Sequence, residues 1–128
     1  MSNCHVIAWV DHAQARVLHI DADNIEKSIV EPAQHPHLHH KRNAIGSGKA
    51  AEDQHFYHGI AQALAGAQEI LITGPGRAEL ELFKHLQHHD PEVAKHAVGL
   101  ETADHPTDGQ LADHARHYFK AKDRMLGV

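Results

Sequence analysis

Glu69-Ile-Leu-Ile-Thr-Gly-Pro-Gly76 is a compact apolar run that stops at two glycines on either side of a proline. Such a run, ended by a turn signal, is typical of a buried strand. Apolar residues recur at helical spacing on both sides of it, in residues 50–64 and in residues 78–88. Alternation of helix and strand is typical of an α/β sheet with helices packed on its faces.

The residues before this region predict three strands. Residues 5–10 form a short apolar run, residues 15–20 alternate apolar and polar side chains, and residues 25–30 alternate more weakly. The connections between them are short and rich in Asp and Asn, which favour turns. Three consecutive strands joined by short turns indicate an antiparallel meander, with Trp9 in the core.

The residues after it predict a fifth strand at residues 96–102 and a final helix that Thr107 caps and that runs to about Lys122. The element order is therefore β-β-β-α-β-α-β-α. This order predicts a mixed five-stranded sheet, with helices on its faces, in a single domain spanning residues 1–128. It is the element order of the ribonuclease-H-like architecture. The helix side chains predicted to face the core include Leu80, Phe83, Leu86, Leu111, Ala115 and Phe119.

The composition excludes several classes of protein. A 128-residue chain with 41% hydrophobic residues can bury a core and is not a disordered tail. Its formal net charge of -5 argues against a wholly basic nucleic-acid coat. Cys4 is the only cysteine, so an intrachain disulfide and a Cys-rich zinc site are both excluded. The sequence shows neither a signal peptide nor an apolar run of about 20 residues, so we expect a cytoplasmic protein without a membrane partner.

Residues 34–50 are neither strand-like nor helix-like, and they form a predicted His-rich basic loop. The loop contains Lys41, Arg42 and Lys49 and no carboxylate, so a local positive patch coexists with an acidic chain. Cations bind phosphates, imidazoles donate hydrogen bonds or stack on bases, and glycines let main-chain amides approach a phosphate. The residues predicted to contact RNA are His37, His39, His40, Lys41, Arg42, Gly46, Gly48 and Lys49.

The same loop suits a second chemistry, metal binding. In a strand-like segment, His35, His37 and His39 fall at i, i+2 and i+4, which places three imidazoles on one face. His55 and His58 lie one turn apart on the following helix. Imidazoles at such spacings can bind Zn²⁺, Ni²⁺ or Cu²⁺, so a metal-binding module is an alternative function. Most of the sixteen histidines are expected to be neutral surface residues, among them His85, His88 and His89.

The sets of residues that enzymes need are incomplete. A nuclease gathers several carboxylates around Mg²⁺, and Asp11 with Glu52 or Asp53 supplies only part of such a set. The fourth strand, where another carboxylate is expected, ends without one. Gly74-Pro-Gly-Arg77 matches neither of the common phosphate-binding glycine motifs, and a tight strand-to-helix turn explains both glycines.

The chain resembles a known superfamily along nearly its whole length. Four stretches carry the resemblance: Ala8-Trp-Val-Asp-His12, the His-rich residues 35–40, residues 70–76, and Val98-Gly-Leu-Glu-Thr-Ala-Asp-His-Pro-Thr-Asp-Gly-Gln110. They look like the central domain of archaeal and eukaryotic peptide-chain release factors and of Pelota. The chain more closely resembles the short bacterial translational machinery proteins of that superfamily. In the release factors, the loop after the third strand ends in a Gly-Gly-Gln tripeptide that promotes hydrolysis of peptidyl-tRNA.

The comparable place in this sequence reads Ile45-Gly-Ser-Gly-Lys-Ala50, without a glutamine after the glycines. The resemblance therefore implies a loop aimed at ribosomal RNA or tRNA, and it does not carry over the hydrolase chemistry. It predicts a non-enzymatic, ribosome- or RNA-associated translation factor, acting in rescue, hibernation or a related role and without a required cofactor. Residual peptidyl-tRNA hydrolysis is the alternative within the same superfamily.

Overall fold

The computed structural model describes residues 5–21, 24–32 and 45–125. Its strands are β1 (His5–Val10), β2 (Ala15–Ile20), β3 (Ile25–Val30), β4 (Glu69–Gly74) and β5 (Ala97–Thr102). They form one five-stranded sheet in the order β3-β2-β1-β4-β5. β1, β2 and β3 pair antiparallel, as a meander, whereas β4 pairs parallel with both β1 and β5. The predicted mixed sheet is therefore confirmed.

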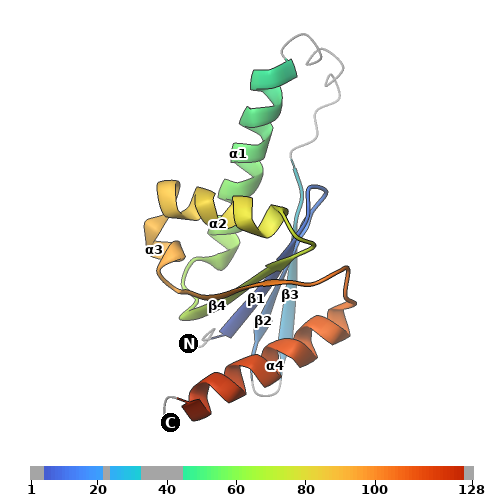
Figure 1. The fold of residues 1–128 in the computed structure, drawn as a ribbon, viewed down its shortest axis with the longest axis vertical. Coiled ribbons are helices and arrows are strands. Elements are labelled where there is room, and N and C mark those ends of the chain that lie inside the picture. Colours follow the sequence, from blue (N-terminus) through green and yellow to red (C-terminus); the bar gives the residue numbers. More distant parts are fainter. Residues whose placement is uncertain (1–4, 22–23, 33–44, 126–128) are drawn as a thin grey trace.

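The helices cover both faces of this sheet (Figure 1). They are α1 (Ile45–Leu64), α2 (Ala78–His89), the short α3 (Pro91–Ala94) and α4 (Asp108–Met125). α1 and α2 pack on one face, and α4 packs alone on the other. None of the helices in the described ranges is long and apolar enough to cross a lipid bilayer.

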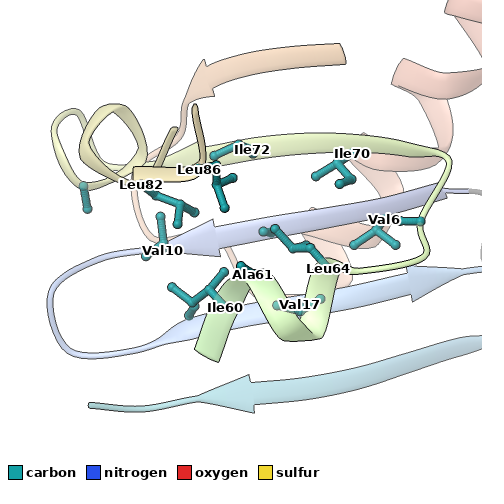
Figure 2. Close-up of a cluster of buried hydrophobic side chains, with 14 of the residues drawn as sticks. Val6, Val10, Val17, Ile60, Ala61, Leu64, Ile70, Ile72, Leu82 and Leu86 are labelled. Atoms are coloured by element: carbon teal, nitrogen blue, oxygen red, sulfur yellow. The ribbon is translucent and has the colours of Figure 1, made fainter. Parts of the chain in front are cut away.

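The larger core lies between the sheet and the helices α1 and α2 (Figure 2). Successive residues of a strand face opposite sides, so alternate side chains of each central strand enter this core. Val6 and Val10 from β1 and Ile70 and Ile72 from β4 are fully buried there. Other elements contribute Val17, Phe56, Ile60, Leu64, Leu82 and Leu86.

The second core lies between the opposite face of the sheet and α4. Trp9 is buried in it, as predicted, and its indole Nε1 donates a hydrogen bond of 2.8 Å to the carbonyl oxygen of Ala103. Leu111, Ala115 and Phe119 of α4 also face this core, as their spacing predicts. The two central strands are thus covered on both faces, which explains why their sequences read as continuous apolar runs.

The N-terminus of α4 is closed by a reciprocal pair of hydrogen bonds. The main-chain NH of Gln110 donates to Thr107 Oγ1 at 3.1 Å, and the main-chain NH of Thr107 donates to Gln110 Oε1 at 2.9 Å. This arrangement is a capping box, in which two otherwise unpaired main-chain donors are satisfied. The predicted cap at Thr107 is confirmed.

Two predictions about helix position differ from the structure. α1 begins at Ile45, five residues before the expected start at Ala50. On α2, the predicted inward face is partly wrong, because Leu80 is 48% exposed and Leu82 is fully buried in its place. The i, i+4 stripe of Ala78, Leu82 and Leu86 packs on the sheet, and this stripe turns Leu80 to solvent.

Candidate functional site

Most of the residues predicted to bind RNA or metal lie in residues 33–44, outside the described part of the chain. They are His35, His37, His39, His40, Lys41 and Arg42. The described chain ends at Pro32, just after β3, and resumes at Ile45. The remaining predicted contacts, Gly46, Gly48 and Lys49, belong to the first turns of α1.

The first turns of α1 lie away from the sheet. The helix has 20 residues, so it is about 30 Å long. Where the burial of α1 is described, from Gln54 onward, Gln54 and His55 are exposed and the buried side chains run from Phe56 to Leu64. In Figure 1 the N-terminal half of α1 projects beyond the sheet. The first turn of α1 contains no acidic residue, so no carboxylate of that turn offsets the positive end of the helix dipole.

Below this projecting end, α1 and α2 line a groove rich in histidine. The groove has a volume of about 430 Å³ and is lined by Gln54, His55, His58, His85 and His89. The sequence indicated the one-turn spacing of His55 and His58 on α1. It did not indicate that α2 brings two further imidazoles to the same place.

His85 is the buried member of this groove, and its predicted exposure is wrong. Its side chain is only 5% exposed, because it lies on the buried side of α2, and its ring centroid is 5.4 Å from that of Tyr57 on α1. Burial, together with the neighbouring His89, lowers the pKa of His85 below its usual value of 6.5, so the ring is neutral near pH 7. The i, i+4 spacing of His85 and His89 is the signal in the sequence that both rings lie on one side of α2.

Asp90, the residue that ends α2, brings a carboxylate to the same region. Its Oδ2 lies 3.7 Å from Nε2 of His85 and 3.9 Å from Nδ1 of His58. Both separations are longer than a hydrogen bond. The groove therefore combines four imidazoles with a carboxylate close by, at a junction of two helices.

The carboxylates at the edge formed by the ends of β1, β4 and β5 are already engaged by protein donors. Asp11 Oδ1 accepts hydrogen bonds from the main-chain NH groups of Ala13 and Gln14, at 2.8 and 2.9 Å. Glu79 is 2% exposed and accepts hydrogen bonds from Gly76 NH at 3.0 Å and from Thr102 Oγ1 at 3.2 Å. These contacts hold the strand-to-helix turns together. The side chains of Glu52 and Asp53 lie outside the described part.

Glu79 also explains the glycine at the end of β4. A Cβ added at Gly74 would lie 2.4 Å from Glu79 Oε1 and 2.7 Å from the carbonyl oxygen of Val10. The sequence-based prediction of a tight turn is compatible with this packing, but it gave no sign of the buried carboxylate beneath the turn.

A third charged cluster joins α4 to the sheet. Asp108 pairs with Arg16 of β2 and with Lys27 of β3. Hydrogen bonds from Lys27 and Arg16 hold the pKa of the Asp108 carboxyl below its usual value. The guanidinium of Arg16 also lies over the Trp9 ring, 4.8 Å from its centroid. This cluster holds α4 against the sheet. Because Arg16 and Lys27 are already paired with Asp108, they offer little positive charge to a ligand.

No protein-family model and no curated protein matches the sequence. Similarity to solved structures is clear, and it extends over nearly the whole chain. Pelota from Archaeoglobus fulgidus aligns with a TM-score of 0.66 and 14% identity, over 96% of this chain and 35% of that protein. An archaeal translation termination factor aligns with a TM-score of 0.53 and 13% identity, over 98% of this chain and 41% of that factor.

A structure described only as an archaeal protein aligns with a TM-score of 0.58 and 15% identity, over 98% of this chain and 40% of its own. The chain therefore spans less than half the length of each of these proteins. At such identities the likeness concerns the fold alone. The chain has the mixed-sheet α/β fold that is found within Pelota and within the archaeal termination factor.

Proposed function

We propose that this protein is a non-enzymatic, cytoplasmic factor that associates with ribosomes through RNA and acts in translation. The observation that supports the proposal is the position of the basic His-rich segment along the chain, directly before and within the start of α1. In the sequence, residues 34–50 follow β3 and run into the first turns of α1, in a chain whose fold is like that of Pelota and of a translation termination factor. Rescue of stalled ribosomes or hibernation would use such a factor.

The charge distribution supports contact with phosphates at this end of the molecule. The chain as a whole is acidic, with a formal net charge of -5, but residues 34–50 contain Lys41, Arg42 and Lys49 and no carboxylate. The outward N-terminus of α1 adds the positive end of a helix dipole to these cations. An acidic body with one basic end favours a single orientation on a polyanion, because repulsion disfavours the other faces.

The same residues argue against hydrolysis as the main activity. The release-factor resemblance places a catalytic glutamine directly after two glycines, and this chain has Lys49 and Ala50 there instead. The backbone of Gly46 and Gly48 is helical. A contact role, in which the segment binds ribosomal RNA or tRNA without cleaving it, needs only cations and hydrogen-bond donors.

Sedimentation with ribosomes tests the proposal. The untagged protein is expected to co-sediment with ribosomes at low salt and to dissociate as salt rises, because phosphate contacts release counterions. The triple variant Lys41→Ala/Arg42→Ala/Lys49→Ala is expected to bind at least about tenfold more weakly, with a shallower dependence on salt. A matched control, Lys84→Ala/Lys95→Ala/Lys120→Ala, removes three exposed cations elsewhere and keeps the net charge equal.

The two variants separate specific binding from general charge effects. If the control weakens binding as much as the loop variant does, net charge and not the segment directs binding. Absence of the wild-type protein from ribosomal fractions at low salt contradicts the proposal as a whole. Release of peptide from peptidyl-tRNA by the purified protein would restore the hydrolase alternative.

A further inference from the structure

The groove between α1 and α2 contains buried polar atoms that no described residue satisfies. Both ring nitrogens of His85 and Oδ2 of Asp90 are buried and have no hydrogen-bond partner within the described residues. Leaving such atoms unpaired destabilises the folded protein, so native proteins usually satisfy them. His85 is not a surface residue that happens to lack a partner, because 95% of its side chain is buried.

The unpaired atoms of His85 and Asp90 lie near a third side chain that can bind a metal, that of His58. Asp90 Oδ2 lies 3.7 Å from His85 Nε2 and 3.9 Å from His58 Nδ1. In a tetrahedral zinc site with bonds of 2.0–2.2 Å, neighbouring ligand atoms lie about 3.3 Å apart. The observed separations exceed that value by roughly half an ångström, which is too far for hydrogen bonds but close to the spacing around an ion.

The exposed member of this arrangement is His58. Among the described side chains, no three His, Cys, Asp or Glu residues already stand at metal-ligand spacing. The side chain of His58 is 58% exposed, so its ring can turn towards Asp90 without disturbing the core. The proposed site requires a rotation of this ring and of the Asp90 carboxylate, whereas His85 is held in place by its burial.

A fourth ligand is available from the same groove. The ring of His89 lies 4.6 Å from that of His85, centroid to centroid, and both rings line the groove together with His55. Imidazoles and one carboxylate suit a borderline ion such as Zn²⁺, whereas Mg²⁺ and Ca²⁺ prefer oxygen ligands only.

We propose that His58, His85 and Asp90, with His89 as the fourth ligand, bind a divalent transition-metal ion, zinc in the first instance, at the junction of α1 and α2. The ion would join the two helices and so fix the direction in which α1 projects from the sheet. This site is separate from the triad His35, His37 and His39 that the sequence predicts in the basic segment. It does not depend on the proposed association with ribosomes.

Zinc titration of the untagged full-length chain tests the proposal. Isothermal calorimetry is expected to show one site, and His85→Gln and Asp90→Asn are each expected to weaken its affinity at least about tenfold. The variant His35→Ala/His37→Ala/His39→Ala, which removes the predicted loop triad, is expected to keep the site at wild-type affinity. Unchanged affinity in the groove variants, loss of the site in the loop variant, or no binding by the wild type would each overturn the proposal.

A second variant excludes a trivial effect through misfolding. His58→Ala removes a mostly exposed side chain, so its circular dichroism spectrum and metal-free melting temperature are expected to match those of the wild type. Zinc is expected to raise the melting temperature of the wild type and to leave that of His58→Ala nearly unchanged. Cobalt in place of zinc should give the visible absorption bands of a tetrahedral site in the wild type only. Equal zinc stabilisation of both proteins would contradict the assignment of His58.

Discussion

Nη1 of Arg16 lies 2.8 Å from Oδ1 of Asp108, and this contact joins the second strand of the sheet to the first turn of the last helix. The two residues are 92 positions apart in the chain. The Arg16 side chain is only 12% exposed, and it also lies over the face of Trp9. Asp108 therefore supplies the counter-charge of a largely buried cation as well as a favourable charge at a helix N-terminus.

Asp108→Asn is expected to lower the free energy of unfolding by about 1 kcal/mol at pH 7, a value reduced for the partial exposure of the carboxylate. The variant keeps the shape of the side chain but removes the charge that Arg16 and Lys27 share. Urea unfolding followed by tryptophan fluorescence measures the difference, because Trp9 lies beside the pair.

The pH dependence of this difference provides its control. The pKa of Asp108 is lowered in the folded protein, so its contribution is complete above the usual value of 3.8 and is lost as pH falls through the lowered pKa. The stabilities of wild type and Asp108→Asn are therefore expected to converge below pH 3.8. A constant difference across that range would show that the charge of Asp108 is not the cause.

His85→Leu is expected to raise the free energy of unfolding of the metal-free protein by about 1 kcal/mol, because it replaces two unpaired buried nitrogens with apolar atoms. Chemical unfolding at pH 7.5 in the presence of a chelator measures this effect. Lower stability of the variant would mean that the ring of His85 has a partner that offsets its burial. The same substitution is expected to abolish zinc binding. His85 would then allow metal binding at the cost of a lower stability of the metal-free protein.

The decrease in the free energy of unfolding at acidic pH is a second test of His85. Its pKa is lowered by folding, so well above pH 6.5 the ring is neutral in both states and contributes almost no pH dependence. As pH falls through 6.5 towards the lowered pKa, the unfolded chain takes up a proton that the folded chain does not, and stability decreases. We expect this decrease to be smaller in His85→Leu than in the wild type, as measured by unfolding at pH 7.5 and pH 5.5.

The sequence predicted the buried face of a helix correctly where the helix has a single apolar stripe. Leu111, Ala115 and Phe119 form the only apolar stripe of their helix, and the helix buries all three. In α2, two stripes overlap, one through Leu80 and Phe83 and the other through Leu82 and Leu86. Periodicity cannot rank two such stripes, because packing against Val10 and Ile72 of the sheet selects between them.

The candidate site was less predictable because its members come together only in three dimensions. The pair His55 and His58 is visible in the sequence as two residues one turn apart. Whether His85 faces the same groove depends on which stripe of α2 is buried, and the wrong choice of stripe made His85 a surface residue. A histidine also carries little signal of its own, because its hydropathy suits both the surface and the interior.

Thr107→Ala is expected to lower the free energy of unfolding by about 1 kcal/mol, because it leaves the main-chain NH of Gln110 without its side-chain acceptor. Thermal unfolding measures the loss. Thr107→Ser keeps the hydroxyl and is the matched control, so it should retain most of the stability. If Thr107→Ser is destabilised as much as Thr107→Ala, the methyl group and not the cap is responsible.

Gly74→Ala is expected to lower the free energy of unfolding by about 2 kcal/mol, because overpacking a rigid site displaces its neighbours. The added Cβ would lie 2.7 Å from the carbonyl oxygen of Val10, which cannot move without distorting the pairing of β1 with β4. It would also meet the buried carboxylate of Glu79. Chemical unfolding of the variant at pH 7 measures the cost.

Gly109→Ala is the matched control for this substitution. At Gly109 the nearest atom to an added Cβ is Thr107 Oγ1, at 4.0 Å, and the residue lies in the first turn of α4. Alanine there meets open space and reduces the entropy of the unfolded chain, so stability is expected to be unchanged or to rise by up to about 1 kcal/mol. Equal destabilisation by both variants would mean that loss of glycine flexibility, and not the contact between the β4 turn and Glu79, explains the cost at Gly74.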